Sequence, residues 1–191
     1  MLKKTLLSVG LALGLVSFVH AADETPIQLS LFHPIQLFGE EKSVGGLRLD
    51  LIYGVNNDVH GVDLGLVNKT TGNQGGVQFG LVNLVDGYFH GWQAGYVNIV
   101  GGDFVGYQEG LVNSVHGNFC GLQYGYVNLT KGTFKGMQAG LWNSAGTSMT
   151  GLQLGLINTT GSLQNGLQIG LLNFNDNKDP LGFFPIVNFS F

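Results

Sequence analysis

Apolar and polar residues alternate along most of this chain, and the alternating pattern returns every fifteen residues without insertion or deletion. One copy contains the run Leu122, Gln123, Tyr124, Gly125, Tyr126 and Val127. A period of two is typical of a β-strand, because successive side chains of a strand point to opposite faces. Glycine and β-branched residues at this density exclude a helix across the repeats. The pattern therefore predicts an all-β protein.

Asparagine marks the period most clearly, and glycine follows the same fifteen-residue step. The repeat asparagines are Asn68, Asn83, Asn98, Asn113, Asn128, Asn143, Asn158, Asn173 and Asn188. So strict a period indicates one supersecondary unit copied many times, whose fold depends on its neighbours.

The residue pairs that follow each strand favour hairpins. Pairs such as Asp86-Gly87 and Lys131-Gly132 suit two-residue turns, and Gly146-Thr147 and Gly161-Ser162 carry the glycine at the first position instead. Thirteen residues of strand and two of turn account for the fifteen. We predict an antiparallel up-and-down meander of about ten strands that closes into a β-barrel, with each glutamine beside a glycine of the next strand.

The two faces of the predicted sheet differ in kind. The positions equivalent to Leu122, Tyr124 and Tyr126 are apolar or aromatic at 23 of 24 sites, and Glu109 is the exception. Their size varies freely, as is expected against fluid lipid rather than in a packed core. An apolar outer face and a small or polar inner face are typical of an outer-membrane barrel. A tilted strand of this length rises roughly 33 Å, enough to cross a bilayer.

The alternative is a β-solenoid with 15-residue coils. In that fold the copies stack in parallel, and the asparagines form a hydrogen-bonded ladder. The column that runs through Leu64, Phe79, Ala94 and Glu109 mixes sizes too widely for a stacked interior, so the barrel is the preferred prediction. The asparagines are expected three residues before each turn, on the apolar side.

The repeats carry the units GVQFGLVN, GYQEGLVN, GLQYGYVN, GLQLGLIN and GLQIGLLN. This part of the chain resembles uncharacterised bacterial surface-repeat proteins with tandem GLQxGLxN units. The resemblance implies export and a surface location, and it brings no known catalytic or ligand-binding residues.

The first residues have the layout of a secretory signal peptide. Lys3 and Lys4 precede an apolar stretch, and Val19-His20-Ala21 fits a cleavage site. We predict a signal peptide at 1–21, an N-terminal segment at 22–42 that forms an extra strand or a plug, and a single repeat domain at 43–191. The predicted location is the outer membrane or surface of a Gram-negative bacterium, with the periplasm or secretion as the alternative.

Charge and motifs exclude several classes of function. Two of the 8 basic residues lie in the signal peptide, which leaves 6 against 12 acidic ones. Nucleic-acid binding is disfavoured because the phosphate backbone requires a basic face. The sequence has no catalytic constellation, metal-ligand cluster or phosphate-binding loop. We therefore expect no enzyme activity, no cofactor and no metal.

The first two strands break the glutamine–glycine rule, because Arg48 and Asp63 stand where glutamine is expected and Asp50 replaces a glycine. In the barrel they form a candidate charge cluster of the lumen, with Asp50 opposite Asp63 and Arg48 diagonally beside it. The cluster either selects ions or small solutes or fills a narrow barrel as an internal ion-pair group, and the second interpretation is preferred.

The preferred function is that of a small outer-membrane β-barrel or surface repeat protein with a structural or narrow-channel role. Its expected partners are membrane lipid and the outer-membrane assembly machinery. The alternative is a soluble exported β-solenoid that acts as a binding or adhesive surface.

Overall fold

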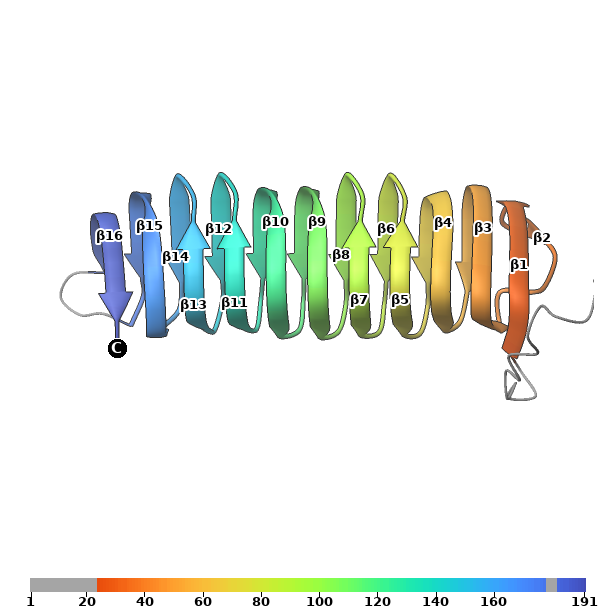
Figure 1. Cartoon of the computed structure of the whole chain (residues 1–191), viewed down its shortest axis with the longest axis horizontal. Helices are drawn as coiled ribbons and strands as arrows, with labels where there is room; N and C mark the ends of the chain where they lie inside the picture. Colours follow the sequence, from red (N-terminus) through yellow and green to blue (C-terminus); the bar gives the residue numbers. More distant parts are fainter. Residues whose placement is uncertain (1–23, 178–181) are drawn as a thin grey trace, which may run out of the picture.

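Residues fifteen apart in the sequence lie side by side in the computed structural model, which describes residues 24–177 and 182–191 (Figure 1). Between β9 (Phe104–Val115) and β10 (Phe119–Thr130), the pairing is parallel and runs from Phe104 opposite Phe119 to Val115 opposite Thr130. The same step relates almost every pair of neighbouring strands. Each repeat is therefore one coil of a stack, and about ten coils follow one another along the long axis.

The predicted antiparallel barrel is wrong, and the chain folds as a parallel β-solenoid. The strands are β1 (Glu24–Phe32), β2 (Ile35–Gln36), β3 (Ser43–Asn56), β4 (Val59–Thr70), β5 (Gln74–Phe79), β6 (Val82–Val85), β7 (Phe89–Ala94), β8 (Val97–Val100), β9 (Phe104–Val115), β10 (Phe119–Thr130), β11 (Thr133–Ala139), β12 (Trp142–Ala145), β13 (Ser148–Leu154), β14 (Ile157–Thr160), β15 (Leu163–Asn175) and β16 (Phe183–Ser190).

Two corners replace the predicted hairpins. In one coil, β5 ends at Phe79, the chain bends at Gly80-Leu81, and β6 begins at Val82. The pair Asp86-Gly87 forms the second corner, after which the chain enters the next coil as β7. The predicted turn pairs do lie at a bend, but the bend leads the chain around a coil instead of reversing it beside itself. Glutamines and asparagines fill the space inside the coils of residues 43–175, and these coils leave no lumen for a channel.

The apolar core is narrow and lies beside the second corner. Phe89, Phe104, Phe119 and Phe134 are fully buried, with neighbouring ring centroids 4.8 to 5.1 Å apart and planes 2 to 14° from parallel. Val85, Val100 and Val115 face them from the other side of the coil. One phenylalanine from each coil thus packs on the next, and this stack holds the spacing of the coils.

Glycine is required where one coil passes closest to the next. Gly121 has φ of 137°, and a Cβ built there lies 1.9 Å from the carbonyl oxygen of Gly106. The equivalent glycine of the next coil, Gly136, has φ of 135° and the same 1.9 Å approach to Gly121. Both the backbone conformation and the lack of space exclude a side chain here, which explains the glycine column of the sequence.

The two ends of the solenoid are closed differently. At the N-terminal end, β1 adds a parallel strand to β3, and β2 folds back antiparallel on β1. At the C-terminal end, β16 pairs antiparallel with β15. The antiparallel strands β2 and β16 thus end the parallel stack at its two ends, and β16 covers the edge of the last coil (Figure 1). The predicted signal peptide lies outside the described residues.

Helices contribute nothing to this architecture within 24–177 and 182–191, where no helix of sufficient length and hydropathy to span a membrane is found.

Replacement of Gly121 by alanine is expected to destabilise the solenoid by more than about 3 kcal/mol, because the methyl group meets a backbone oxygen at a positive φ. Urea unfolding followed by circular dichroism measures the loss. Cys120→Ala is the matched control, since Cys120 is the exposed neighbour of Gly121, and it is expected to stay within about 0.5 kcal/mol of wild type. A Gly121→Ala protein as stable as the control contradicts the close approach.

Candidate functional site

The repeat asparagines form a continuous ladder inside the solenoid. From Asn68 to Asn158, each side-chain nitrogen donates to the Oδ1 of the asparagine in the next coil, at distances of 2.8 to 2.9 Å. Each of these nitrogens also donates to a backbone carbonyl, as Asn113 does to Tyr124 at 2.8 Å. The side chains are fully buried. The prediction that the asparagines face the apolar side was therefore wrong, because the corner at Gly80-Leu81 turns them inward.

The repeat glutamines form a second ladder that runs in the opposite direction. The Nε2 of Gln93 donates to the Oε1 of Gln78 at 2.7 Å, and the pattern continues to Gln168, so every donor points toward the N-terminal end. At the C-terminal end, Asn188 donates to the Oε1 of Gln168 at 2.6 Å. Glutamine thus lies beside glutamine, not beside glycine as the barrel register predicted.

Asp63 ends the glutamine ladder because a carboxylate accepts but does not donate. Gln78 donates to its Oδ2 at 2.8 Å. Arg48 holds the same carboxylate from the neighbouring coil, with Nε to Oδ1 at 2.7 Å and Nη2 to Oδ2 at 2.6 Å. The remaining guanidinium nitrogen donates to the carbonyl of Lys69 at 2.8 Å. Arg48 and Asp63 are both fully buried, so the ion pair terminates the ladder inside the protein.

Asp50 takes the place of the missing asparagine in the first complete coil. Gly54 stands opposite Asn68, and a Cβ built on Gly54 falls 1.9 Å from the Oδ1 of Asp50. The Asp50 carboxyl therefore occupies the space of the absent side chain. The Oδ1 of Asn68 is buried without a hydrogen bond, and the buried Asp50 carboxyl makes none to it. An ionised carboxylate cannot donate to Asn68, whereas a protonated one can.

Burial and charge set the ionisation of this group. Burial raises the pKa of Asp50 to about 6, against the opposing effects of Arg48, whose Nε lies 3.2 Å from Oδ2, and of the Ser30 hydroxyl. Burial also disfavours the charge of Arg48, but the attraction and hydrogen bonds of Asp63, together with Asp50, raise the pKa of Arg48 overall.

The three charged residues of the predicted cluster thus lie together, in an arrangement that differs from the prediction. Arg48 pairs with Asp63 in register and Asp50 lies opposite Gly65, whereas the barrel placed Asp50 opposite Asp63. The three side chains are buried in the solenoid, and Asp50 also borders a groove at the N-terminal end. Their contacts are those of an internal end to the ladders.

The exposed surface with the most regular chemistry is one long edge of the solenoid. We define the apolar edge as three columns: the corner column, and the columns two residues before and one residue after it. The corner column consists of Leu66, Leu81, Tyr96, Leu111, Tyr126, Leu141, Leu156 and Leu171, all 44 to 64% exposed. The preceding column is Leu64, Phe79, Ala94, Glu109, Tyr124, Ala139, Leu154 and Ile169. The following column is Val67, Val82, Val97, Val112, Val127, Trp142, Ile157 and Leu172.

Glu109 is the one charged residue of the apolar edge. The hydroxyl of Tyr107 donates to its Oε2 at 2.6 Å, and this hydrogen bond is the main reason that the pKa of Tyr107 is raised to about 12. The carboxylate therefore has a partner within its own coil. Every other residue of the edge is apolar or aromatic.

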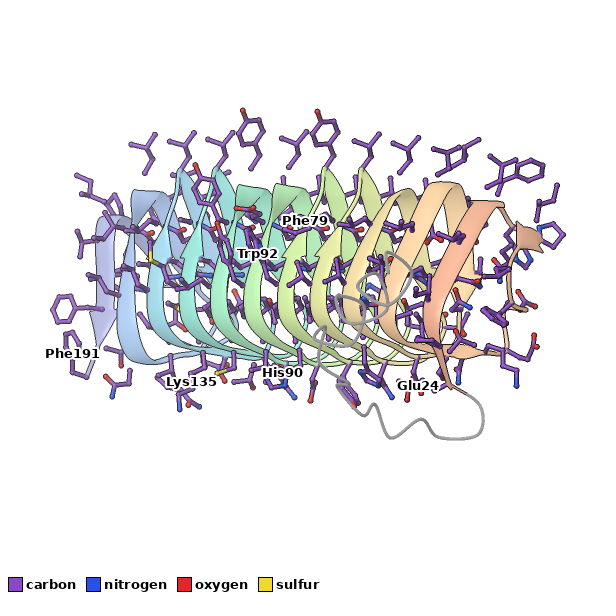
Figure 2. All side chains as sticks on the ribbon, turned by 45° about the vertical axis from the view of Figure 1, so that its right-hand side comes forward. Glu24, Phe79, His90, Trp92, Lys135 and Phe191 are labelled. Carbon is purple, nitrogen blue, oxygen red and sulfur yellow. The ribbon has the colours of Figure 1, made fainter. Side chains whose placement is uncertain are left out.

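The opposite edge is polar. Figure 2 shows His90 and Lys135 pointing away from the row of side chains at the upper edge. His60 lies in the same column as His90, with Gly75 between them. No group of three or more potential metal ligands occurs among the described residues. The column of His90 and Lys135 therefore differs in chemistry from the apolar edge, although it includes the exposed Val105.

Comparison with known protein families, curated proteins and solved structures finds no match to this chain.

The apolar edge escaped the sequence analysis as a single surface. The alternation revealed its first two columns but assigned them to lipid around a barrel. The valine column after the corner was placed on the other face, because the bend at Gly80-Leu81 was not recognised. The signal was present: a glycine followed by leucine or tyrosine stands at this corner in every repeat from Gly65 to Gly170.

Replacement of Asp63 by glutamine is expected to cost roughly 3–5 kcal/mol, because it removes the main partner of the buried Arg48. The double variant Arg48→Gln/Asp63→Gln is expected to recover most of that loss, since two glutamines extend the ladder. Urea unfolding of the two single variants and the double variant gives the coupling energy. Additive losses contradict the role of the ion pair as the end of the ladder.

The raised pKa of Asp50 predicts a pH-dependent stability. Between about pH 4 and 6 the folded protein binds more protons than the unfolded chain, so its free energy of unfolding falls as the pH rises, by roughly 3 kcal/mol. Urea midpoints across this range measure the slope. Asp50→Asn is the control, and it is expected to flatten the slope and to be more stable than wild type at pH 7. An unchanged slope in this variant assigns the pH dependence to other groups.

Proposed function

We propose that this protein is an exported scaffold whose apolar edge is a binding or adhesive surface. The observation that carries the proposal is the edge itself, which repeats the same exposed apolar chemistry once per coil on a hydrogen-bonded core. A monomeric soluble protein rarely leaves so large a continuous apolar surface uncovered, and such a surface is typical of an interaction site.

The sequence supports export. The signal-peptide layout at 1–21 and the resemblance to bacterial surface-repeat proteins both favour a location outside the cytoplasm. The surface of the bacterium and the periplasm both fit this proposal. The barrel-dependent predictions, a narrow channel and an outer-membrane barrel, are not retained, because the chain folds as a solenoid. The expectation of assembly by the outer-membrane machinery was tied to that barrel.

A binding scaffold also agrees with the chemistry of the interior. The buried polar groups are occupied with one another in ladders, and the charged residues Arg48 and Asp63 are shielded from solvent. None of these groups is presented to a substrate. We therefore keep the prediction that the protein has no enzyme activity.

Two lysines on the corner column, Leu81→Lys and Leu141→Lys, are expected to abolish adhesion to apolar surfaces, because each places a charge where the partner is apolar. Retention of the purified protein on an alkyl-substituted matrix measures this effect. The expected result is early elution of the double variant and late elution of wild type.

The matched control carries two lysines on the column of Lys135, as His60→Lys and Val105→Lys, which are both exposed. It adds the same number of charges away from the apolar edge and is expected to elute like wild type. Circular dichroism checks that all variants fold. Wild-type retention of the folded edge variant overturns the proposal.

A further inference from the structure

We propose that the partner of the apolar edge is a lipid bilayer whose headgroups carry no net charge, with the solenoid lying along the membrane surface and its corner column among the acyl chains. This inference rests on the proposed function and names its partner.

The charge distribution favours an uncharged, apolar partner. Charge is excluded from the apolar edge except at Glu109, which is hydrogen-bonded to Tyr107. The whole chain has a net charge of -4, with 12 acidic and 8 basic residues. Anionic lipids would repel such a protein, whereas zwitterionic lipids would not. The attraction that remains is burial of apolar surface, which is the main contribution to interfacial binding of amphipathic elements.

The relief of the edge favours a fluid partner over a folded one. The column that precedes the corner contains the small Ala94 and Ala139 as well as the much larger Phe79 and Tyr124. A second protein surface, including a second copy of this chain, needs matching shape to pack at the density of an interface core. Acyl chains adapt to uneven relief without that requirement.

The backbone at the corner is already satisfied, which burial in lipid requires. The amide of Leu81 donates to the carbonyl of Leu66 at 2.9 Å, Tyr96 to Leu81 at 2.9 Å, and Leu111 to Tyr96 at 3.0 Å. The corner of each of these coils is thus bonded to the corner of the coil before it. An unsatisfied peptide group in hydrocarbon costs several kcal/mol, and these bonds remove that cost where the chain would otherwise be exposed.

The dimensions fit shallow insertion. Coils stacked at about 4.8 Å make an edge of eight coils roughly 35–40 Å long. Interfacial elements bury their apolar face about 5–10 Å deep, a depth that suits insertion of the corner column. Tyr96 and Tyr126 belong to this column and Trp142 to the column beside it, and aromatic side chains with a polar atom are enriched at the membrane interface.

A groove at the N-terminal end extends the edge. It has a volume of about 720 Å³ and is lined mostly by leucine and isoleucine from β1–β2 and from the first coils, including Leu29, Ile35, Leu51 and Leu66, with Ser30 and Asp50 also on its wall. Leu66 belongs to the corner column, so the groove and the edge form one continuous apolar surface. The groove has room for acyl-chain segments beside the corner column.

Vesicles of phosphatidylcholine test the inference. Wild type is expected to co-sediment with them. The binding is expected to persist in about 1 M salt, where the Debye length is only about 3 Å and electrostatic attraction between exposed charges is screened. The variant with Leu81→Lys and Leu141→Lys is expected to bind at least about tenfold more weakly, while the His60→Lys/Val105→Lys control binds like wild type. Replacement of phosphatidylcholine by phosphatidylglycerol is expected to weaken binding at low salt.

Fluorescence locates the bound edge. In a Trp92→Phe background, Trp142 is the remaining tryptophan. Lipids with brominated acyl chains are expected to quench the fluorescence of Trp142 when the apolar edge is otherwise wild type, but not when it carries the two lysines. If the protein binds the vesicles but Trp142 is not quenched, another surface contacts the membrane and the inference is overturned.

The failures of the two proposals are distinguishable. A wild-type protein that is retained on the alkyl matrix but does not bind vesicles overturns the lipid inference and leaves the adhesive surface standing. Stronger binding to phosphatidylglycerol than to phosphatidylcholine overturns the inference that the lipid headgroups carry no net charge. A dimer in light scattering that the edge lysines convert to a monomer assigns the edge to a second copy.

Discussion

The requirement that every buried amide find its partner in the next coil governs this structure. Asn113 has a donor on one side and an acceptor on the other only if its neighbours lie fifteen residues away on both sides. The same requirement applies to Gln123 in the second ladder, which donates to Gln108 and accepts from Gln138. One residue inserted into a coil would move these side chains out of register and leave buried polar groups unpaired, at roughly 1–3 kcal/mol each. The strict period of the sequence is the direct result.

The special residues of the chain are those that end this repetition. Asp63 accepts from the last glutamine, Arg48 neutralises it, and Asp50 occupies the site of the absent asparagine. Residues that looked like a functional cluster are thus needed for a structural reason. The functional surface is instead assigned to the corner of the coil, where leucine or tyrosine side chains are about half exposed to solvent.

Sequence periodicity predicted the β-class, the copied unit and one of the two corners. It could not separate pairing from stacking, because a strand alternates identically in both, and Asp86-Gly87 suits a hairpin as well as a coil corner. The bend at Gly80-Leu81 decided the matter. It depends on the close approach of successive coils, which is a long-range property. The charged residues Arg48 and Asp63 were recognised as neighbours, but their register required the parallel pairing.

The opposite directions of the two ladders have an electrical consequence. Along the axis, the asparagine amides all point toward one end and the glutamine amides toward the other. Their dipoles therefore oppose each other, in contrast to an α-helix, whose peptide dipoles add along its length. Each added coil contributes one of each, so lengthening by duplication builds up no net field from these rows. The number of coils is then free of an electrostatic limit, and residues such as Asp63 and Asn188 determine where the array stops.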